Sequence, residues 1–180
     1  MNFKNIKLFL SDVDGCMTNG TVYVGPDDER VGFDIQDGIG HRLADYAGIE
    51  VGWLSGRHSE PVAVRARKLK VPHLYQGVSD KLKKAVEHCE KQGLSLSQVA
   101  YLGDDLIDIP LLQKVGWAVA AKNARSEVKA AADYVTRARG GEGAFREAVE
   151  KLIKAQGLWN QTLKKFHATN AAPPPRFNLD

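Results

Sequence analysis

Short apolar runs alternate with helical patterns along this chain. Four runs contain few polar positions and are bounded by Gly, Ser or Asp: Ile6–Ser11, Ile49–Ser55, Val99–Asp104 and Gly116–Ala121. Short runs without polar alternation are typical of strands that are buried on both faces, as in a parallel sheet. We therefore expect at least these segments to form neighbouring strands.

Apolar residues with helical spacing stand between and after these runs. Leu82, Ala85, Val86 and Cys89 occupy positions i, i+3, i+4 and i+7, and residues 145–153 repeat that stripe. The alternation of strands and helices predicts βαβ units. The expected fold is α/β, with a doubly wound, Rossmann-like core around a mainly parallel central sheet.

Two segments depart from this alternation. Thr21–Phe33 contains two β-prone runs around a Gly-Pro-Asp-Asp turn, which predicts a β-hairpin flap directly after the first strand. The helical pattern fades at Gly157, so we expect one domain over residues 1–157 and a C-terminal tail over 158–180. The Pro-rich end of that tail is not expected to be helical. It is either disordered or a stiff arm that carries Arg176 to an anionic ligand in a neighbouring subunit.

Polar side chains follow three of the predicted strands directly. They are Asp12 and Asp14, then Ser55 and Arg57, then Asp104, Asp105 and Asp108. The carboxyl ends of parallel strands lie at one edge of a sheet, where α/β proteins bind ligands. Two carboxylates about 4 Å apart repel by roughly 4 kcal/mol at an effective dielectric near 20. A divalent cation would offset that repulsion.

Lys81 opens a predicted helix. Together with the polar residues at the strand ends, it supplies the functional groups that metal-assisted phosphoryl transfer needs. Taken alone, each also fits a turn, an N-cap or a solvated helix residue. As a set they provide a carboxylate nucleophile, a second carboxyl for acid–base work, a hydroxyl and a cation for phosphoryl oxygens, and acidic metal ligands.

Composition narrows the class of protein further. The net charge of +3 arises mostly after Gln156, so the remaining chain is nearly neutral and does not indicate a nucleic-acid surface. Cys16 and Cys89 lack metal-ligand spacing and are expected to be free thiols of a reducing compartment. No apolar stretch approaches a membrane span. We therefore expect a cytoplasmic protein with no membrane or nucleic-acid partner.

The motifs DxD, SGR, a Lys and GDDxxD, in this order, resemble the four motifs of the haloacid dehalogenase superfamily of phosphatases. Longer blocks such as DVDGCMTNG, DIQDGIG, HLYQGVSDKL and VAYLGDDLIDIP resemble the branch that acts on 3-deoxy-D-manno-octulosonate (KDO) 8-phosphate in lipopolysaccharide sugar biosynthesis. The resemblance spans residues 6–157. It implies a core without a cap domain, Mg²⁺ as cofactor and hydrolysis through an aspartyl phosphate.

The resemblance also implies a role for each motif residue. Asp12 is the expected nucleophile, and Asp14 the expected acid and base. Mg²⁺ is expected to be held by the carboxylates of Asp12 and Asp104 and by the backbone carbonyl of Asp14. Ser55 and Lys81 are expected to hold phosphoryl oxygens, and Asp105 and Asp108 to orient metal-bound waters or Lys81.

A further set of residues is implied to bind the phosphosugar. It comprises Asp14, Asp34, Ile35, Gln36, Asp37, Gly38, Arg42, Arg57, Arg65 and Lys81. Helix capping by Asp37 and solvated helix faces for Arg42 and Arg65 are the alternatives. Gln36 stands where some relatives carry a basic residue. The family further implies a homotetramer, in which a neighbouring subunit completes the capless site.

Two other functions compete with this interpretation. A nonulosonate 9-phosphate, from a sialic-acid-like pathway, would fit the same scaffold, although relatives of that type carry an acidic residue where Arg57 stands. A receiver-type signalling domain is also doubly wound, but it needs a lone aspartate at the end of a middle strand. Here the second predicted strand ends in Ser55, which favours the phosphatase.

Overall fold

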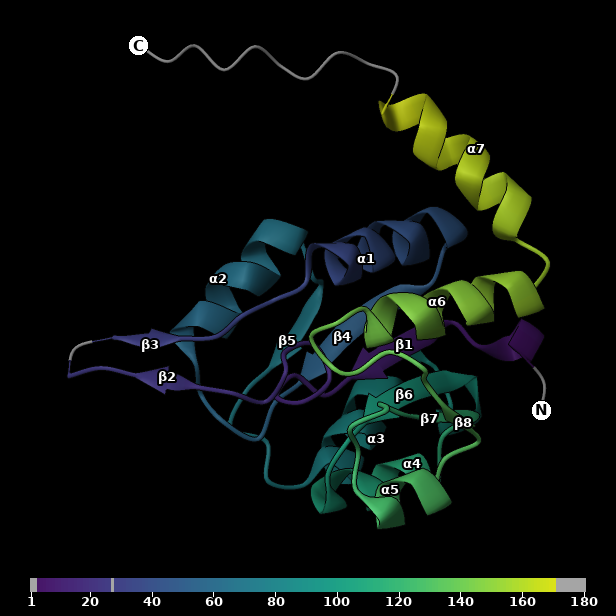
Figure 1. Ribbon diagram of the computed structural model, residues 1–180. Helices are drawn as coiled ribbons and strands as arrows, with labels where there is room; N and C mark the ends of the chain where they lie inside the picture. Colours follow the sequence, from purple (N-terminus) through teal and green to yellow (C-terminus); the bar gives the residue numbers. More distant parts are fainter. Residues whose placement is uncertain (1–2, 27, 171–180) are drawn as a thin grey trace, which may run out of the picture.

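The computed structural model describes residues 3–26 and 28–170 (Figure 1). Over these residues, six strands form one parallel sheet in the spatial order β5-β4-β1-β6-β7-β8. They are β1 (Leu8–Ser11), β4 (Glu50–Leu54), β5 (His73–Tyr75), β6 (Val99–Gly103), β7 (Trp117–Ala120) and β8 (Tyr134–Val135). The predicted parallel sheet is thereby confirmed.

The two outermost strands were not predicted from the sequence. β5 and β8 contain three and two residues and are only partly buried. An edge strand covered on fewer sides needs no continuous apolar run, so periodicity does not distinguish it from a loop. The predicted hairpin is confirmed by β2 (Tyr23–Val24) and β3 (Glu29–Arg30), which pair antiparallel.

Helices cover both faces of the sheet, as a doubly wound fold requires (Figure 1). One face carries α1 (Ile35–Ala47), α2 (Glu60–Leu69) and α6 (Ala144–Ala155). The other carries α3 (Lys81–Gln92), α4 (Ile109–Leu112) and α5 (Ser126–Ala130). Short 3₁₀ turns occupy Phe3–Asn5, Leu96–Gln98 and Leu106–Asp108. Within the described residues no cap domain interrupts this core.

Successive side chains along each central strand point to opposite faces of the sheet, so each face has its own hydrophobic core beneath its helices. Phe9 and Trp53 pack with Phe145 of α6 on one face. Leu10 and Tyr101 pack with α3 and α4 on the other. Fully burying an aliphatic or aromatic side chain of this size contributes about 1.5–3 kcal/mol. The strand ends that carry the polar motifs are thus held by a rigid scaffold.

The region after Gly157 has more structure than the sequence pattern indicated. Trp159–Asn170 forms α7, which lies against α1 (Figure 1). Lys165 Nζ donates to the carbonyl of Tyr46 at 2.8 Å, and the Phe166 ring lies 6.2 Å from that of Tyr46. The helix is held by these contacts with α1, which a single-segment pattern does not reveal. Arg176 lies outside the described residues.

None of the described helices combines the length and apolar character needed to cross a membrane.

Candidate active site

The predicted site residues meet where the strand order changes direction. β1 has β4, which follows it in the chain, on one side, and β6, which follows a long crossover, on the other. Ser11 is in register with Leu102, and the amide of Asp12 donates to the Leu102 carbonyl at 2.9 Å. Asp12 therefore leaves β1 into the crevice at the carboxyl end of the sheet, the usual place for a ligand in such folds.

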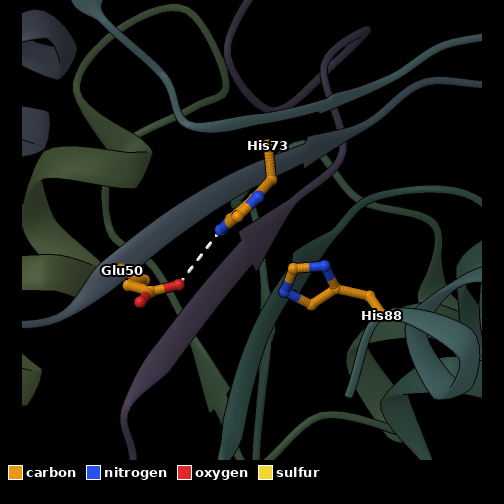
Figure 2. Close-up of side chains that lie close together, drawn as sticks. All are labelled: Glu50, His73 and His88. Atoms are coloured by element: carbon orange, nitrogen blue, oxygen red, sulfur yellow. Dashed lines mark hydrogen bonds and ion pairs between the residues drawn. The ribbon is translucent and has the colours of Figure 1, made fainter. Parts of the chain in front are cut away.

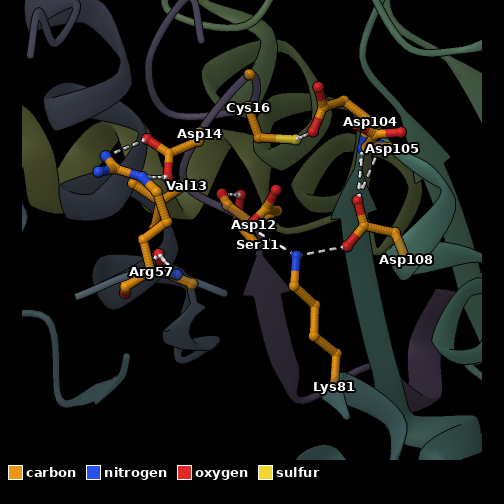
Figure 3. A network of polar contacts seen from close by, with 12 residues as sticks. Ser11, Asp12, Val13, Asp14, Cys16, Arg57, Lys81, Asp104, Asp105 and Asp108 are labelled. Carbon is orange, nitrogen blue, oxygen red and sulfur yellow. Dashed lines mark hydrogen bonds and ion pairs between the residues drawn. The ribbon is translucent and has the colours of Figure 1, made fainter. Parts of the chain in front are cut away.

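Lys81 links two of the aspartates at the centre of the site (Figure 3). Its Nζ lies 2.8 Å from Asp12 Oδ1 and 2.7 Å from Asp108 Oδ1. Asp12 is 6% exposed and Lys81 2% exposed, so their charges are shielded from water. Burial lowers the pKa of Lys81, but the two carboxylates outweigh burial and the net pKa is raised. The ammonium is therefore permanently charged.

Asp108 is the residue that fixes Lys81 in place. Its Oδ2 accepts hydrogen bonds from the amides of Asp104 and Asp105, at 2.9 and 3.1 Å, and its Oδ1 also accepts from the Tyr101 hydroxyl. With every oxygen bonded and the residue fully buried, its carboxylate can orient Lys81 but has no room for substrate. Asp105 caps the 3₁₀ turn that follows, because its Oδ1 accepts from the amide of Leu106 at 2.7 Å.

The site carries an excess of negative charge. Among the described residues, the three carboxylates of Asp12, Asp104 and Asp108 gather around one ammonium, so negative charges outnumber positive ones by two when all are ionised. Burial, followed by repulsion from Asp108, raises the pKa of Asp104 to about 6. Burial also raises the pKa of Asp12, against the opposing effect of Lys81. A divalent cation with a preference for oxygen would balance this charge, so the residues fit Mg²⁺.

The turn after β1 brings a thiol and a glycine against Asp104. Gly15 has φ +87°, and a Cβ there would lie 2.1 Å from Asp104 Oδ2, so only glycine fits. The Sγ of Cys16 lies 3.8 Å from Asp104 Oδ1. Burial raises the pKa of Cys16, so the protonated thiol acts as a donor to Asp104. A hard cation such as Mg²⁺ takes oxygen ligands, so the neutral thiol of Cys16 is not expected to bind it.

Asn123 is a further residue of the site that the sequence reasoning missed. Its Nδ2 donates to the Gly15 carbonyl at 2.9 Å, and its Oδ1 accepts from the amide of Gly140 at 2.6 Å. It thereby fastens the turn after β1 to the loops after β7 and β8. A single Asn in a loop has no sequence signal that would identify this role.

Asp14 points away from the lysine and pairs with Arg57 (Figure 3). Arg57 donates from Nε and Nη2 to the two carboxylate oxygens, at 3.0 and 3.2 Å, and its Nη1 lies 3.3 Å from Glu29 Oε2. Glu29 in turn accepts from the Ser59 hydroxyl at 2.6 Å. Glu29 and Ser59 were not predicted, because the hairpin and α2 come together only in three dimensions.

Ser55 is placed at the end of β4 by its own loop. Its hydroxyl donates to the Arg57 carbonyl at 3.1 Å and accepts from the Arg57 amide at 3.2 Å. Its amide donates to the carbonyl of Tyr75 in the neighbouring strand. The hydroxyl therefore sits at the same edge of the sheet as Asp12.

Two residues of the predicted substrate segment Asp34–Gly38 act as helix caps. Asp34 Oδ1 accepts from the amide of Gln36 at 2.7 Å and caps α1. Asp37 is buried, and its Oδ1 accepts from the amide of Arg146 at 2.9 Å in the first turn of α6. Ile35 and Gln36 are exposed.

Arg65 and Arg42, both expected to bind substrate, occupy different surroundings. Arg65 Nη2 lies 3.5 Å from the Asp34 carbonyl, and its guanidinium lies against Gly38. Arg42 lies over the ring of Phe166 at 5.2 Å, between α1 and α7. Arg65 is thus close to the predicted substrate segment, whereas Arg42 is engaged by the C-terminal helix.

A hollow lies beside the Arg57 network. It has a volume of about 560 Å³ and is lined by Glu29, Phe33, Ser59 and Arg65, among others. Glu29 and Ser59 belong both to this hollow and to the network that holds Asp14. The hollow is therefore connected to Asp14 by a continuous set of polar contacts through Arg57.

Comparison with known proteins agrees with this geometry. Residues 62–146 match the family of haloacid dehalogenase-like hydrolases. The chain is 43% identical to the KDO 8-phosphate phosphatase KdsC of Escherichia coli over 155 residues, which is 86% of this chain and 82% of that protein. A receiver-type signalling domain is thereby excluded.

Solved structures give the same result. The KDO 8-phosphate phosphatase of Moraxella catarrhalis, in complex with magnesium, phosphate and KDO, matches with a TM-score of 0.88 and 36% identity over 91% of this chain and 95% of that one. The cobalt-bound enzyme of Haemophilus influenzae matches with a TM-score of 0.85 and 32% identity over 90% and 98%. The chain belongs to the haloacid dehalogenase-like hydrolases, in the family of 3-deoxy-D-manno-octulosonate 8-phosphate phosphatases.

Proposed function

We propose that this protein is a Mg²⁺-dependent phosphatase that hydrolyses KDO 8-phosphate to KDO and phosphate, in lipopolysaccharide sugar biosynthesis. The observation that carries the proposal is the cluster of Asp12, Lys81, Asp104 and Asp108 at the carboxyl end of β1, with two negative charges in excess. The identity to KdsC and the KDO-bound relative support the substrate.

Asp12 is the proposed nucleophile. Its carboxylate attacks phosphorus in line with the leaving sugar oxygen and becomes an aspartyl phosphate, which water then hydrolyses. Mg²⁺ held by the carboxylates of Asp12 and Asp104 and the carbonyl of Asp14 would compensate the charge of the phosphoryl group. Lys81, locked by Asp108, and the hydroxyl of Ser55 hold phosphoryl oxygens as charge shifts onto them.

Asp14 is the proposed acid and base. It protonates the leaving sugar oxygen and later accepts the proton of the attacking water. The ion pair with Arg57 engages both of its oxygens in the ionised form. For Asp14 to carry a proton, Arg57 has to turn toward another anion, and the carboxylate of the sugar acid is a suitable one.

The sugar is proposed to extend from Asp12 past Arg57 toward the hollow that Arg65 lines. The segment Asp34–Gly38 adjoins that hollow through the contact of Arg65 with the Asp34 carbonyl. Arg42 is proposed to act across a subunit boundary.

The protein is also proposed to be a cytoplasmic homotetramer. In the hairpin and at the start of α1, Tyr23 is 63% exposed, Val24 79% and Ile35 78%. Exposed apolar side chains around a capless site offer a surface to a neighbouring subunit. The proposed location rests on the unpaired thiols of Cys16 and Cys89.

Phosphate release tests the proposal. The enzyme is assayed on KDO 8-phosphate and on a nonulosonate 9-phosphate, each with Mg²⁺ and with excess chelator. We expect turnover of KDO 8-phosphate with the larger kcat/KM, and its loss with chelator. Preference for the nonulosonate would reassign the substrate. Turnover that is indifferent to chelator would reject the metal-dependent mechanism.

A further inference from the structure

A second cluster of metal-ligating side chains lies away from the catalytic residues (Figure 2). Glu50 is the first residue of β4, His73 is the first of β5, and His88 faces them from α3. Since the strands are parallel, Glu50 and His73 lie at the amino ends of the sheet, whereas Asp12 follows a carboxyl end. The two clusters are therefore at opposite edges of the sheet.

The three side chains approach one another closely. Glu50 Oε2 lies 3.0 Å from His73 Nε2, and the His73 and His88 ring centroids are 4.4 Å apart. One ligating atom from each residue lies within 4.8 Å of those of the other two. The side chain of Glu50 is 56% exposed and that of His73 19% exposed, so an ion can enter from solvent.

His88 contributes an unsatisfied nitrogen to this cluster. The residue is 3% exposed, its Nδ1 lies 2.9 Å from the Tyr75 hydroxyl, and its Nε2 has no hydrogen-bond partner among the residues that the structure describes. In Figure 2 that Nε2 is on the side of the ring that faces His73 and Glu50. Buried polar atoms are otherwise almost always bonded, so an unbonded ring nitrogen that faces two other potential ligands requires an explanation.

The Tyr75 hydroxyl is placed to fix the tautomer of His88. With its proton on Nδ1, His88 donates to the Tyr75 oxygen, and Nε2 carries the lone pair. Histidines that ligate metals are typically oriented by such a hydrogen bond from the second ring nitrogen.

We propose that Glu50, His73 and His88 bind a transition-metal dication of the Zn²⁺ type. Two imidazoles and one carboxylate are a common protein ligand set for zinc and leave the fourth position to water. Zinc at about 2.0–2.1 Å from each ligand separates the ligand atoms by about 3.3 Å, close to the present spacing of Glu50 and His73. Mg²⁺ prefers oxygen ligands, so the two edges of the sheet select different ions.

The experiment uses Co²⁺ as a spectroscopic substitute for Zn²⁺, with the full chain and excess Mg²⁺ present. The test variant is His73→Gln. The matched control is His167→Gln, on the exposed face of α7. Asp104→Asn separately weakens the catalytic metal site. His88 is left intact because its burial makes a folding defect the simplest result of replacing it.

We expect the visible absorption of tetrahedral Co²⁺ in the wild type, in His167→Gln and in Asp104→Asn. In His73→Gln it should be lost, with Co²⁺ affinity at this site at least tenfold weaker and phosphatase activity within twofold of the wild type. Zn²⁺ should raise the melting temperature of Asp104→Asn but not that of an Asp104→Asn, His73→Gln double variant. Equal Co²⁺ spectra and affinities in the wild type and His73→Gln would overturn the proposal.

Discussion

Asp12 is the residue on which the proposed chemistry depends. In Asp12→Asn the amide cannot form an acyl phosphate, so turnover of KDO 8-phosphate should fall by about 10³-fold or more. The variant should remain folded, because it removes one of three clustered carboxylates while Lys81 keeps Asp108. Phosphate release and urea denaturation check both parts. Asp45→Asn, on the exposed side of α1, is the control. A folded Asp12→Asn with wild-type turnover would contradict the mechanism.

Arg57 offers a test of how the substrate is selected. Charge-assisted hydrogen bonds contribute roughly 1.5–3 kcal/mol, so Arg57→Ala should lower kcat/KM for KDO 8-phosphate by about ten- to a hundredfold. A small aryl phosphate without a carboxylate should lose much less. Arg57→Lys should recover little, because an ammonium cannot hold both oxygens of a carboxylate. Equal losses on both substrates would mean that Arg57 does not select the substrate and serves only its ion pairs with Asp14 and Glu29.

At the scale of elements, α6 depends on a residue of another helix. Its N-cap is Gly143, which has no side chain to offer, and Asp37 of α1 accepts from the amide of Arg146 instead. Burial raises the pKa of Asp37 to about 6 from 3.8. Ionisation of the Asp37 carboxyl therefore destabilises the folded protein relative to the unfolded chain.

The sign of the resulting pH dependence follows from that shift. The folded protein holds the Asp37 proton more tightly than the unfolded chain, so the stabilisation from Asp37 is complete below pH 4 and is lost as the pH rises toward 6. The loss amounts to about 3 kcal/mol. Asp37→Asn should lack this component. Urea denaturation of both proteins at pH 4, 5, 6 and 7 measures it. If the difference in unfolding free energy between them is constant from pH 4 to 6, the shift is absent.

The C-terminal helix can be tested by two truncations. Removing residues 158–180 deletes α7, whose Trp159 and Phe166 pack against the core. Partial burial of two aromatic side chains predicts a loss of about 2–4 kcal/mol in unfolding free energy. Removing only residues 171–180 should keep that stability and isolates the contribution of Arg176 to KM. Equal stability of the 1–157 and 1–170 proteins would show that α7 adds nothing to the fold.

At the scale of the whole molecule, the parallel sheet separates two kinds of chemistry. Its carboxyl edge gathers hard oxygen ligands and one locked ammonium around Asp12, whereas its amino edge holds the imidazoles of His73 and His88. Both clusters draw residues from segments far apart in the sequence. Because the six strands of the main sheet run in the same direction, one edge collects strand starts and the other strand ends, and α3 adds His88 to the first and Lys81 to the second.

The sequence by itself predicted the strands with continuous apolar runs, the hairpin and the motif residues that meet at the candidate site. These are local signals: β1 and β6 are buried on both faces and so are almost entirely apolar, and the aspartates follow them directly. Parallel pairing then necessarily brings Asp12 and Asp104 to one edge. The resemblance of the motifs added the family.

The tertiary structure decided which polar side chains touch. Of the two roles expected for Asp108, contact with Lys81 is the one that the structure shows. The contact of Glu29 with Arg57 and the cap of α6 by Asp37 were not predicted. The edge strands and α7 were likewise missed, because their stability comes from packing against other elements. A hydrogen bond or a partly buried face leaves no periodic trace in a sequence, since it depends on a distance between segments that only the folded chain defines.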